Sequence, residues 1–302
     1  MTKTEKLKKS KPLSNQRPFI VLLAPYLMFF FVFTVIPVIS AIILSFTDFN
    51  MVSVNNIVGF DNYIRMFFED DIFTIALKNT LIYALVTGPV GFILSFVIAW
   101  FINEQNRVIR TIVTFIVYSP ALAGNIFFIW LYIFSSDSRG FLNDLLLKLG
   151  LITDPVEWLS NTDYSFTIVM IVIIWMSFGT GFLSFVSGLK VLNRSYFEAA
   201  AIDGLKNRWQ ELYYVTFPQM GPQLMFGAVM SISGAFAVGS VNQALTGMPS
   251  TDYCTHTILL HMTDYATTRF EMGYASAIAV VLFVMMLLFY MIVHKVVSKF
   301  SD

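Results

Sequence analysis

Six long apolar segments divide this chain and decide what it can fold into. They cover residues 19–46, 76–102, 111–134, 165–189, 219–246 and 273–294. Each is longer than the ~20 residues that a helix needs to cross the hydrocarbon core of a bilayer. Only helices and closed barrels satisfy their backbone hydrogen bonds in lipid, and the segments lack the period-two alternation of barrel strands. The sequence therefore predicts an all-α membrane protein with six transmembrane helices.

Composition supports this interpretation and excludes other classes. Of the 302 residues, 57% are hydrophobic and 13% are charged, whereas soluble domains carry roughly a quarter charged residues. The net charge of zero argues against a nucleic-acid-binding surface, so no nucleic acid is expected as a partner. Cys254 has no second cysteine in the chain with which to form a disulfide. The apolar run at 19–46 follows a basic stretch, but it exceeds the ~7–15 apolar residues of a secretory signal and is expected to be a retained first helix.

Lysine and arginine set the expected orientation. Fourteen of the 19 fall in the segments 1–18, 103–110, 190–218 and 295–302, and five fall elsewhere. Because cytoplasmic loops carry the excess of Lys and Arg, both termini are expected in the cytoplasm, together with the 190–218 loop between the fourth and fifth helices. The expected organisation is a basic tail at 1–18, a transmembrane domain at 19–294 and a second tail at 295–302.

The loop between the fourth and fifth helices carries the most distinctive polar stretch. Ser195 and Glu198 fit a capping box, in which each side chain bonds a backbone N–H at the start of a helix. Three alanines then favour helix and leave one face with little bulk. Gly204 is placed to end this helix in a left-handed conformation, and Asn207 is placed to cap a second helix that stops near Pro218. A short helix of this shape suits docking into a groove of another protein.

The chain lacks the motifs of common catalytic sites. No G-x-x-x-x-G-K-[ST] occurs, so no phosphate-binding loop for ATP is present, and G-x-S-x-G, H-E-x-x-H and C-x-x-C are missing too. His256 and His261 lie five residues apart, near Asp252, Cys254 and Asp264. Metal-binding histidine pairs on a helix prefer a spacing of four, and the ligand spacing of structural zinc is missing. We therefore expect a protein that is not an enzyme, with no catalytic residue, no metal site and no cofactor of its own.

The predicted spanning helices carry neutral polar residues in place of charges. The segments 165–189 and 219–246 contain no ionisable residue, although ion-coupled carriers usually keep such residues along their pathway. Hydroxyl groups recur along one face of each segment, which favours a pathway for a neutral, hydroxyl-rich solute; close helix packing through small residues is the alternative. The candidate pathway residues are Trp175, Ser177, Thr180, Ser233, Phe236, Ser240 and Asn242.

Part of the cytoplasmic loop matches a known pattern. Glu198-Ala-Ala-x-x-Asp203-Gly204, followed by Pro218 and Pro222, resembles the EAA loop of permease subunits of binding-protein-dependent ABC importers, and more closely that of maltose-type carbohydrate permeases. Shorter similarities extend the resemblance over about residues 19–294. They lie at residues 44–48, 58–63, 78–80, 140–143 and 272–277.

The resemblance implies an importer made of several chains in a bacterial or archaeal cell (inner) membrane. A second homologous permease would complete the pore, and an ABC ATPase dimer would bind ATP and Mg and hydrolyse the ATP. An extracellular or periplasmic solute-binding protein would deliver a sugar or oligosaccharide. The residues that the resemblance assigns to coupling with the ATPase are Glu198, Ala199, Ala200, Asp203, Gly204 and Pro218.

Three departures from the family pattern and two alternatives accompany this interpretation. Leu205 and Phe217 differ from the pattern but stay apolar, whereas Leu-Thr-Gly-Met-Pro at 245–249 replaces L-T-x-G-G-P and leaves the sugar open. Within the family, the alternative is an importer of glycerol phosphate or another polyol derivative, although an anionic solute favours a basic residue in the pathway. Outside the family, the alternative is an ion-coupled secondary carrier.

Overall fold

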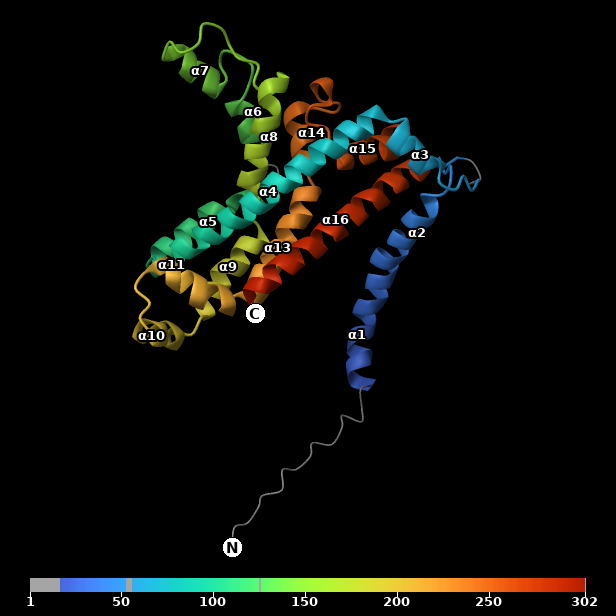
Figure 1. Ribbon diagram of the computed structural model, residues 1–302. Coiled ribbons are helices and arrows are strands. Elements are labelled where there is room, and N and C mark those ends of the chain that lie inside the picture. Colours follow the sequence, from blue (N-terminus) through green and yellow to red (C-terminus); the bar gives the residue numbers. More distant parts are fainter. Residues whose placement is uncertain (1–16, 53–55, 125, 302) are drawn as a thin grey trace.

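The computed structural model describes residues 17–52, 56–124 and 126–301, which form helices joined by loops (Figure 1). Within these residues, the one extended pairing is an isolated antiparallel bridge between Thr47 and Ile57. The expectation of an all-α chain is confirmed. The predicted tail at 1–18 lies outside the described residues except for its last two positions. The final helix, α16 (Met272–Ser301), continues through the predicted C-terminal tail.

The first helix diverges from the bundle and contacts it through its C-terminal part. α1 (Arg17–Phe30), the π-helical turn η1 (Phe31–Val35) and α2 (Ile36–Leu44) form one rod, drawn in blue in Figure 1. In the most apolar stretch of this rod none of the side chains is buried. The widened turn ends two residues before Pro37, where its extra width relieves the clash between the proline ring and the carbonyl four residues earlier. An apolar rod of this kind is suited to contact with lipid or with another chain.

α4 (Asp71–Asn103) is the central helix of the bundle. It packs along α9 (Thr180–Val191) and α13 (Gly221–Phe236), and α13 also packs along α16. Glycine permits a close approach where α9 crosses α13, because a Cβ at Gly181 would lie 3.4 Å from the Cα of Gly227. Small residues at helix crossings are the usual means of close packing in a membrane.

Three of the six predicted transmembrane segments are each broken into two helices. The pairs are α5 (Arg107–Leu122) with α6 (Phe128–Ile133), α8 (Thr162–Met176) with α9, and α13 with α14 (Ser240–Thr246). The second and third pairs bend by 40° and 41°. By length and apolar composition, three described helices qualify as spans, and five qualify if each of these bent pairs is one span.

The two bends correct the expectation of continuous fourth and fifth helices. Proline is the residue that usually kinks a spanning helix, yet Pro89 lies inside an uninterrupted α4. Both bends instead end at a glycine that precedes the next helix, Gly179 before α9 and Gly239 before α14. Glycine allows the chain to leave the helical conformation at low steric cost, and the sequence signal was therefore a glycine, not a proline.

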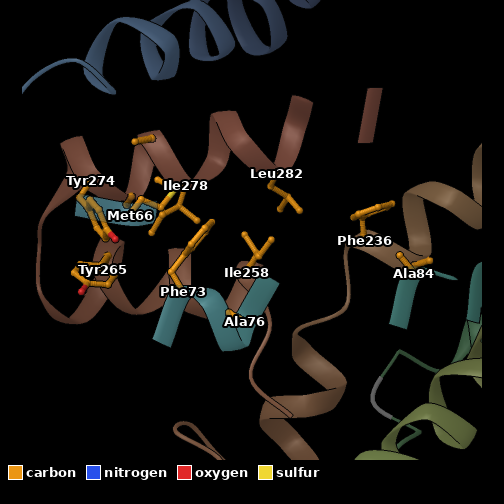
Figure 2. Close-up of a cluster of buried hydrophobic side chains, with 13 residues drawn as sticks. Met66, Phe73, Ala76, Ala84, Phe236, Ile258, Tyr265, Tyr274, Ile278 and Leu282 are labelled. Carbon is orange, nitrogen blue, oxygen red and sulfur yellow. The ribbon is translucent and has the colours of Figure 1, made fainter. Parts of the chain in front are cut away.

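A buried cluster fixes one end of the bundle, where α3 (Asp61–Phe68), the start of α4, α15 (Ile258–Thr263) and the start of α16 meet (Figure 2). We call this the α15 end. The buried side chains at its centre include Met66, Phe73, Ile258 and Ile278, which are fully shielded. Segments from the first third and the last fifth of the chain are thus joined by one apolar core.

α7 (Phe141–Lys148) projects from the bundle beyond α6 (Figure 1). Its fully buried Asn143 donates to the carbonyl oxygens of Ser135 (3.1 Å) and Val156 (3.0 Å), and accepts from the indole N–H of Trp158 (2.8 Å). Gly140 leaves room for this arrangement, since a Cβ there would lie 2.5 Å from the carbonyl oxygen of Ser135. The Gly-Phe-Leu-Asn stretch at 140–143 therefore organises the projection.

Candidate functional site

The loop at 190–218 forms a short helix at the opposite end of the bundle from α15 (Figure 1). α10 (Arg194–Ile202) begins after Asn193, whose side chain accepts from the backbone N–H of Ser195 at 3.0 Å. The predicted capping box of Ser195 and Glu198 is therefore wrong, because asparagine is an equally good cap and takes the capping position two residues earlier. Glu198 instead pairs with Arg194 at 3.6 Å along the exposed face of the helix.

The predicted glycine corner is confirmed. Gly204 has φ +94°, and its N–H bonds the carbonyl oxygen of Ala201 (3.2 Å) while the N–H of Leu205 bonds that of Ala200 (3.1 Å). This pair of bonds is the Schellman arrangement, which satisfies the last free carbonyls of a helix and needs a residue at positive φ. Nothing lies within 4 Å of a Cβ built on Gly204, so the requirement for glycine there comes from the backbone alone.

A second helix follows the corner, as predicted. Asn207 caps it by accepting from the N–H of Gln210 at 2.9 Å. The helix runs through α11 (Arg208–Glu211), η2 (Leu212–Thr216) and α12 (Phe217–Gln219), so it ends just past Pro218. The π-helical turn η2 again precedes a proline, as η1 does.

The α11 helix is tied to the end of α4, whereas α10 is exposed. Arg208 forms an ion pair with Glu104, and the rings of Trp100 and Trp209 lie 5.5 Å apart. No residue of α10 is buried, and its Ile202 is 87% exposed. The result is a rigidly capped helix whose surface is open to a partner.

The two bent helix pairs meet at a cavity of about 260 Å³. Hydroxyl groups and glycines make up much of its wall, together with apolar side chains of α8, α9 and α13. The hydroxyl-bearing residues are Thr87, Ser95, Ser177, Thr180, Ser231 and Ser240, and the glycines are Gly179, Gly181, Gly234 and Gly239. None of the described residues that line the cavity is ionisable.

The first residues of α9 and α14, at the two bends, line this cavity. α9 and α14 each begin at a bend without a side-chain cap, and the first N–H groups of a helix have no partner within it. Non-helical backbone at membrane depth is tolerated where it is buried in protein or lines a water-filled cavity. The cavity therefore offers hydroxyl groups to a solute without offering charge.

The predicted pathway residues fall into two groups. Ser177, Thr180 and Ser240 line the cavity, whereas Ser233 is not part of its wall. The three other predicted side chains have other surroundings. Trp175 packs on Trp130 with ring centres 5.3 Å apart, Phe236 packs on Phe289 at 5.0 Å, and the buried Asn242 donates to the carbonyl oxygen of Thr255 at 2.7 Å.

Thr87 and Ser95 on α4 are cavity residues that sequence reasoning missed. They lie eight residues apart and therefore on one side of the helix, but they are embedded in a long apolar run that gave them no separate signal. The glycines Gly179 and Gly239 were missed as well. Each directly precedes a hydroxyl residue, and this repeated glycine–hydroxyl pair marks both bends.

The α15 end holds a buried polar network around Asp70. Its carboxylate is 2.9 Å from Nε2 of His261 and accepts from the Tyr274 hydroxyl (2.7 Å) and the Phe73 N–H (2.9 Å). Burial favours a raised Asp70 pKa, but the hydrogen bonds from His261, Phe73 and Tyr274 outweigh it and hold the pKa well below its usual range. Nδ1 of His261 lies 3.3 Å from Nε2 of His256, and burial lowers the His256 pKa to about 4.

This network was not predicted as a unit, because Asp70 and His261 are 191 residues apart in sequence. The spacing of the two histidines predicted no metal site there. Among the described residues, no group of three or more His, Cys, Asp or Glu side chains is arranged to hold a metal ion.

Comparison with known proteins identifies the family of the chain. A family model described as "binding-protein-dependent transport system inner membrane component" matches residues 88–301, which include both bends and the whole of the α10 loop. The chain belongs to this family. It is thus a multi-pass inner-membrane permease, a component of a transport system and not an enzyme by itself.

Individual relatives cover nearly the whole permease. The probable ABC transporter permease YesP of Bacillus subtilis (strain 168) is 30% identical over 91% of this chain and 89% of its own length. The arabinooligosaccharides transport system permease AraP of the same organism is 29% identical over 92% and 88%. The fold matches a chain in the crystal structure of a bacterial ABC transporter involved in the import of the acidic polysaccharide alginate, with a TM-score of 0.77, 23% identity, and coverage of 95% and 97%.

Proposed function

We propose that this permease forms half of the membrane pathway for a neutral sugar or oligosaccharide in an ATP-driven importer. The observation that carries the proposal is the cavity at the two bends, which is lined by hydroxyl-bearing residues and by no ionisable side chain among its described residues. Neutral hydroxyls of a saccharide can exchange hydrogen bonds with such a wall, and the absence of charge avoids the cost of placing an unpaired ion in the membrane.

The remaining parts of the importer are proposed from the family and from α10. Six transmembrane helices place both termini and α10 in the cytoplasm, with α5 and α6 counted as one span. A second homologous permease completes the cavity, and a solute-binding protein delivers the sugar from outside. An ABC ATPase dimer, which binds ATP and Mg, docks on the cytoplasmic side.

α10 is the proposed contact with the ATPase. Its exposed surface supports this role, because a groove on the partner can receive the small side chains of Ala199 and Ala200, with Glu198 and Asp203 near basic groups. Gly204 fixes the angle at which α10 leaves the chain, and the helix that contains Pro218 leads back into α13. Closure of the ATPase pair on ATP then rocks the permeases between inward-facing and outward-facing states.

An anionic substrate and an ion-coupled mechanism are the two alternatives to this proposal. Glycerol phosphate or another anionic polyol derivative would favour a basic residue in the pathway, which the described cavity wall of this subunit lacks. An ion-coupled carrier would favour a buried ionisable residue at the same place. The names of two relatives, the arabinooligosaccharide permease AraP and the lactose permease LacF of Rhizobium radiobacter, add support for a saccharide.

The decisive experiment is solute-stimulated ATP hydrolysis and uptake by the purified assembly in vesicles, with its binding protein added. Neutral oligosaccharides, oligouronates and glycerol phosphate are compared at equal concentration. We expect stimulation by one or more neutral saccharides, and uptake that requires ATP and ignores an imposed ion gradient. Stimulation by an anionic solute alone, or uptake that follows the ion gradient without ATP, would contradict the proposal.

A further inference from the structure

The bend between α13 and α14 is held by a residue that lies outside the cavity wall. Thr257 donates its hydroxyl proton to the carbonyl oxygen of Val238, with an O···O distance of 2.8 Å. Val238 lies between the two helices and lines the cavity. Because Thr257 is 1% exposed, its hydroxyl satisfies a carbonyl that water reaches poorly, and an unpaired carbonyl there would be unfavourable.

A second contact holds the same bend by packing. A Cβ built on Gly239 would lie 3.0 Å from Cδ2 of Leu259, so the Leu259 side chain rests directly on the bare backbone at the bend. Thr257 and Leu259 are the N-cap and the second residue of α15. The start of α15 therefore meets the bend on two consecutive backbone units.

α15 is itself fixed to α4, the other long wall of the bundle. The Ile258 N–H donates to Oγ1 of Thr80 at 2.9 Å, and His261 bonds the carboxylate of Asp70 at the start of α4. α15 is thus anchored to α4 through its first and fourth residues, and it connects α4 to the bend between α13 and α14.

We propose that α15 is a brace that sets the angle of the α13–α14 bend, with Thr257 and Leu259 as positioning residues for the cavity wall at Val238, Gly239 and Ser240. The effect of this brace on transport rests on the proposed function, because it requires that the cavity is the solute pathway. Its effect on the shape of the wall is independent of that condition.

The first experiment measures the wall directly. Ser240→Cys is introduced as a reporter into the assembled importer, with the native Cys254 replaced by Ser, and its reaction rate with a charged thiosulfonate is followed in vesicles. We expect Thr257→Val to change this rate about fivefold, the effect of one lost hydrogen bond, and Thr257→Ser to restore the parental rate. Thr263→Val is the matched control, because it removes a hydroxyl of the same helix that bonds only within α15, to the carbonyl oxygen of Leu259 at 2.8 Å.

The second experiment measures transport by the same variants without the reporter. Thr257→Val is expected to lower maximal uptake about fivefold and to leave the half-saturating concentration of loaded binding protein unchanged. If Thr257→Val fails to assemble, Gly239→Ala tests the same brace, because it crowds Leu259, and Leu259→Ala in the same chain is expected to reverse its effect on uptake.

Two outcomes would overturn the brace. One is a Thr257→Val variant that matches Thr263→Val in both labelling and uptake. The other is a Gly239→Ala defect that Leu259→Ala does not relieve. Failure of the wild-type assembly to take up any saccharide, together with altered labelling of the Ser240→Cys reporter in Thr257→Val, would reject the proposed function and still support the brace.

Discussion

α10 and α15 are both short helices next to long spans, and they differ in how far their side chains are buried. No residue of α10 is buried, whereas Ile258, Leu260 and His261 of α15 are all buried. The chain covers α15 with its own α4 and α16, and it leaves α10 open. This contrast separates a helix that is buried in the fold from a helix that is left exposed, as the proposed contact with an ATPase requires.

Each helix also takes part in an acid–base pair, and the two pairs show the same contrast. Asp70 and His261 are 2.9 Å apart, with side chains 8% and 1% exposed. Glu198 and Arg194 are 3.6 Å apart, with the carboxylate 69% exposed. A buried charged hydrogen bond contributes to stability, while an exposed pair contributes little and its carboxylate stays available for a partner.

Asp70→Asn is expected to have the largest effect on the α15 side of the comparison. It removes the charge that His261 and Tyr274 bond, at a cost of about 2–3 kcal/mol in local stability. Cys254 reports this opening, because its carbonyl and thiol are bonded to Asn79 and Ser165 nearby (3.0 and 3.2 Å). Maleimide labelling of the native Cys254 should accelerate by roughly thirtyfold or more. An unchanged labelling rate would mean that the network does not hold this end closed.

A fall in pH should lower the stability of the α15 end through protonation of His256. Its pKa is about 4 in the fold and about 6.5 when unfolded. The unfolded chain therefore takes up a proton first as pH falls, and the stability that is present above pH 6.5 declines toward pH 4. Between pH 7 and pH 5 the loss is about 2 kcal/mol.

The measurement is the midpoint of thermal unfolding, followed by tryptophan fluorescence at pH 7 and pH 5. His256→Gln, which stays neutral at both pH values, should show a smaller difference between the two midpoints than the wild type. His294→Gln is the control, because His294 is exposed on α16. Equal pH sensitivity of the wild type and His256→Gln would reject the assignment to His256.

Gly204→Val tests the α10 side and should leave the α15 side untouched. The left-handed conformation costs a residue with a side chain about 1–2 kcal/mol, and the added side chain meets no atom that would oppose it. Solute-stimulated hydrolysis and uptake should fall about tenfold with no change in Cys254 labelling. Gly204→Asn is the matched variant, since asparagine adopts this conformation more readily. If valine and asparagine behave alike, the backbone angle does not control coupling.

Glu198→Gln is expected to have the smallest effect on stability. Loss of its exposed pair with Arg194 should change the unfolding free energy by no more than about 0.5 kcal/mol, so the melting midpoint should stay within error of the wild type. Coupled uptake should still fall, because the proposed partner of the carboxylate lies on the ATPase. A melting shift as large as that of Asp70→Asn would remove the distinction between the two pairs.

The same contrast explains what the sequence could predict. The Gly204 corner and the Asn207 cap depend on neighbouring residues, and both predictions are confirmed. α10 was also recognisable by its motif, which lies in consecutive residues of one loop. Even here the predicted start was wrong, since Asn193 and Ser195 compete as caps and local rules rank them equally.

α15 could not be predicted in this way. Its role depends on Thr80, Asp70 and Val238, which come from distant parts of the chain, and a six-residue helix has little periodicity of its own. The bends at Gly179 and Gly239 were hidden for a related reason. An apolar segment with a few glycines has the composition of a continuous span, and packing decides at which glycine the chain changes direction.

The rod formed by α1 and α2 has a consequence for how the protein is made. It leaves the ribosome before the helices of the bundle and has no buried side chains in its most apolar stretch, so it can enter the membrane and remain there as a stable helix before the bundle exists. The later helices, which share the Asp70 network and the bends, must wait for one another. Insertion of the first helix is thereby separated in time from assembly, and a chain stalled once this rod has emerged from the ribosome is expected to be already anchored in the bilayer.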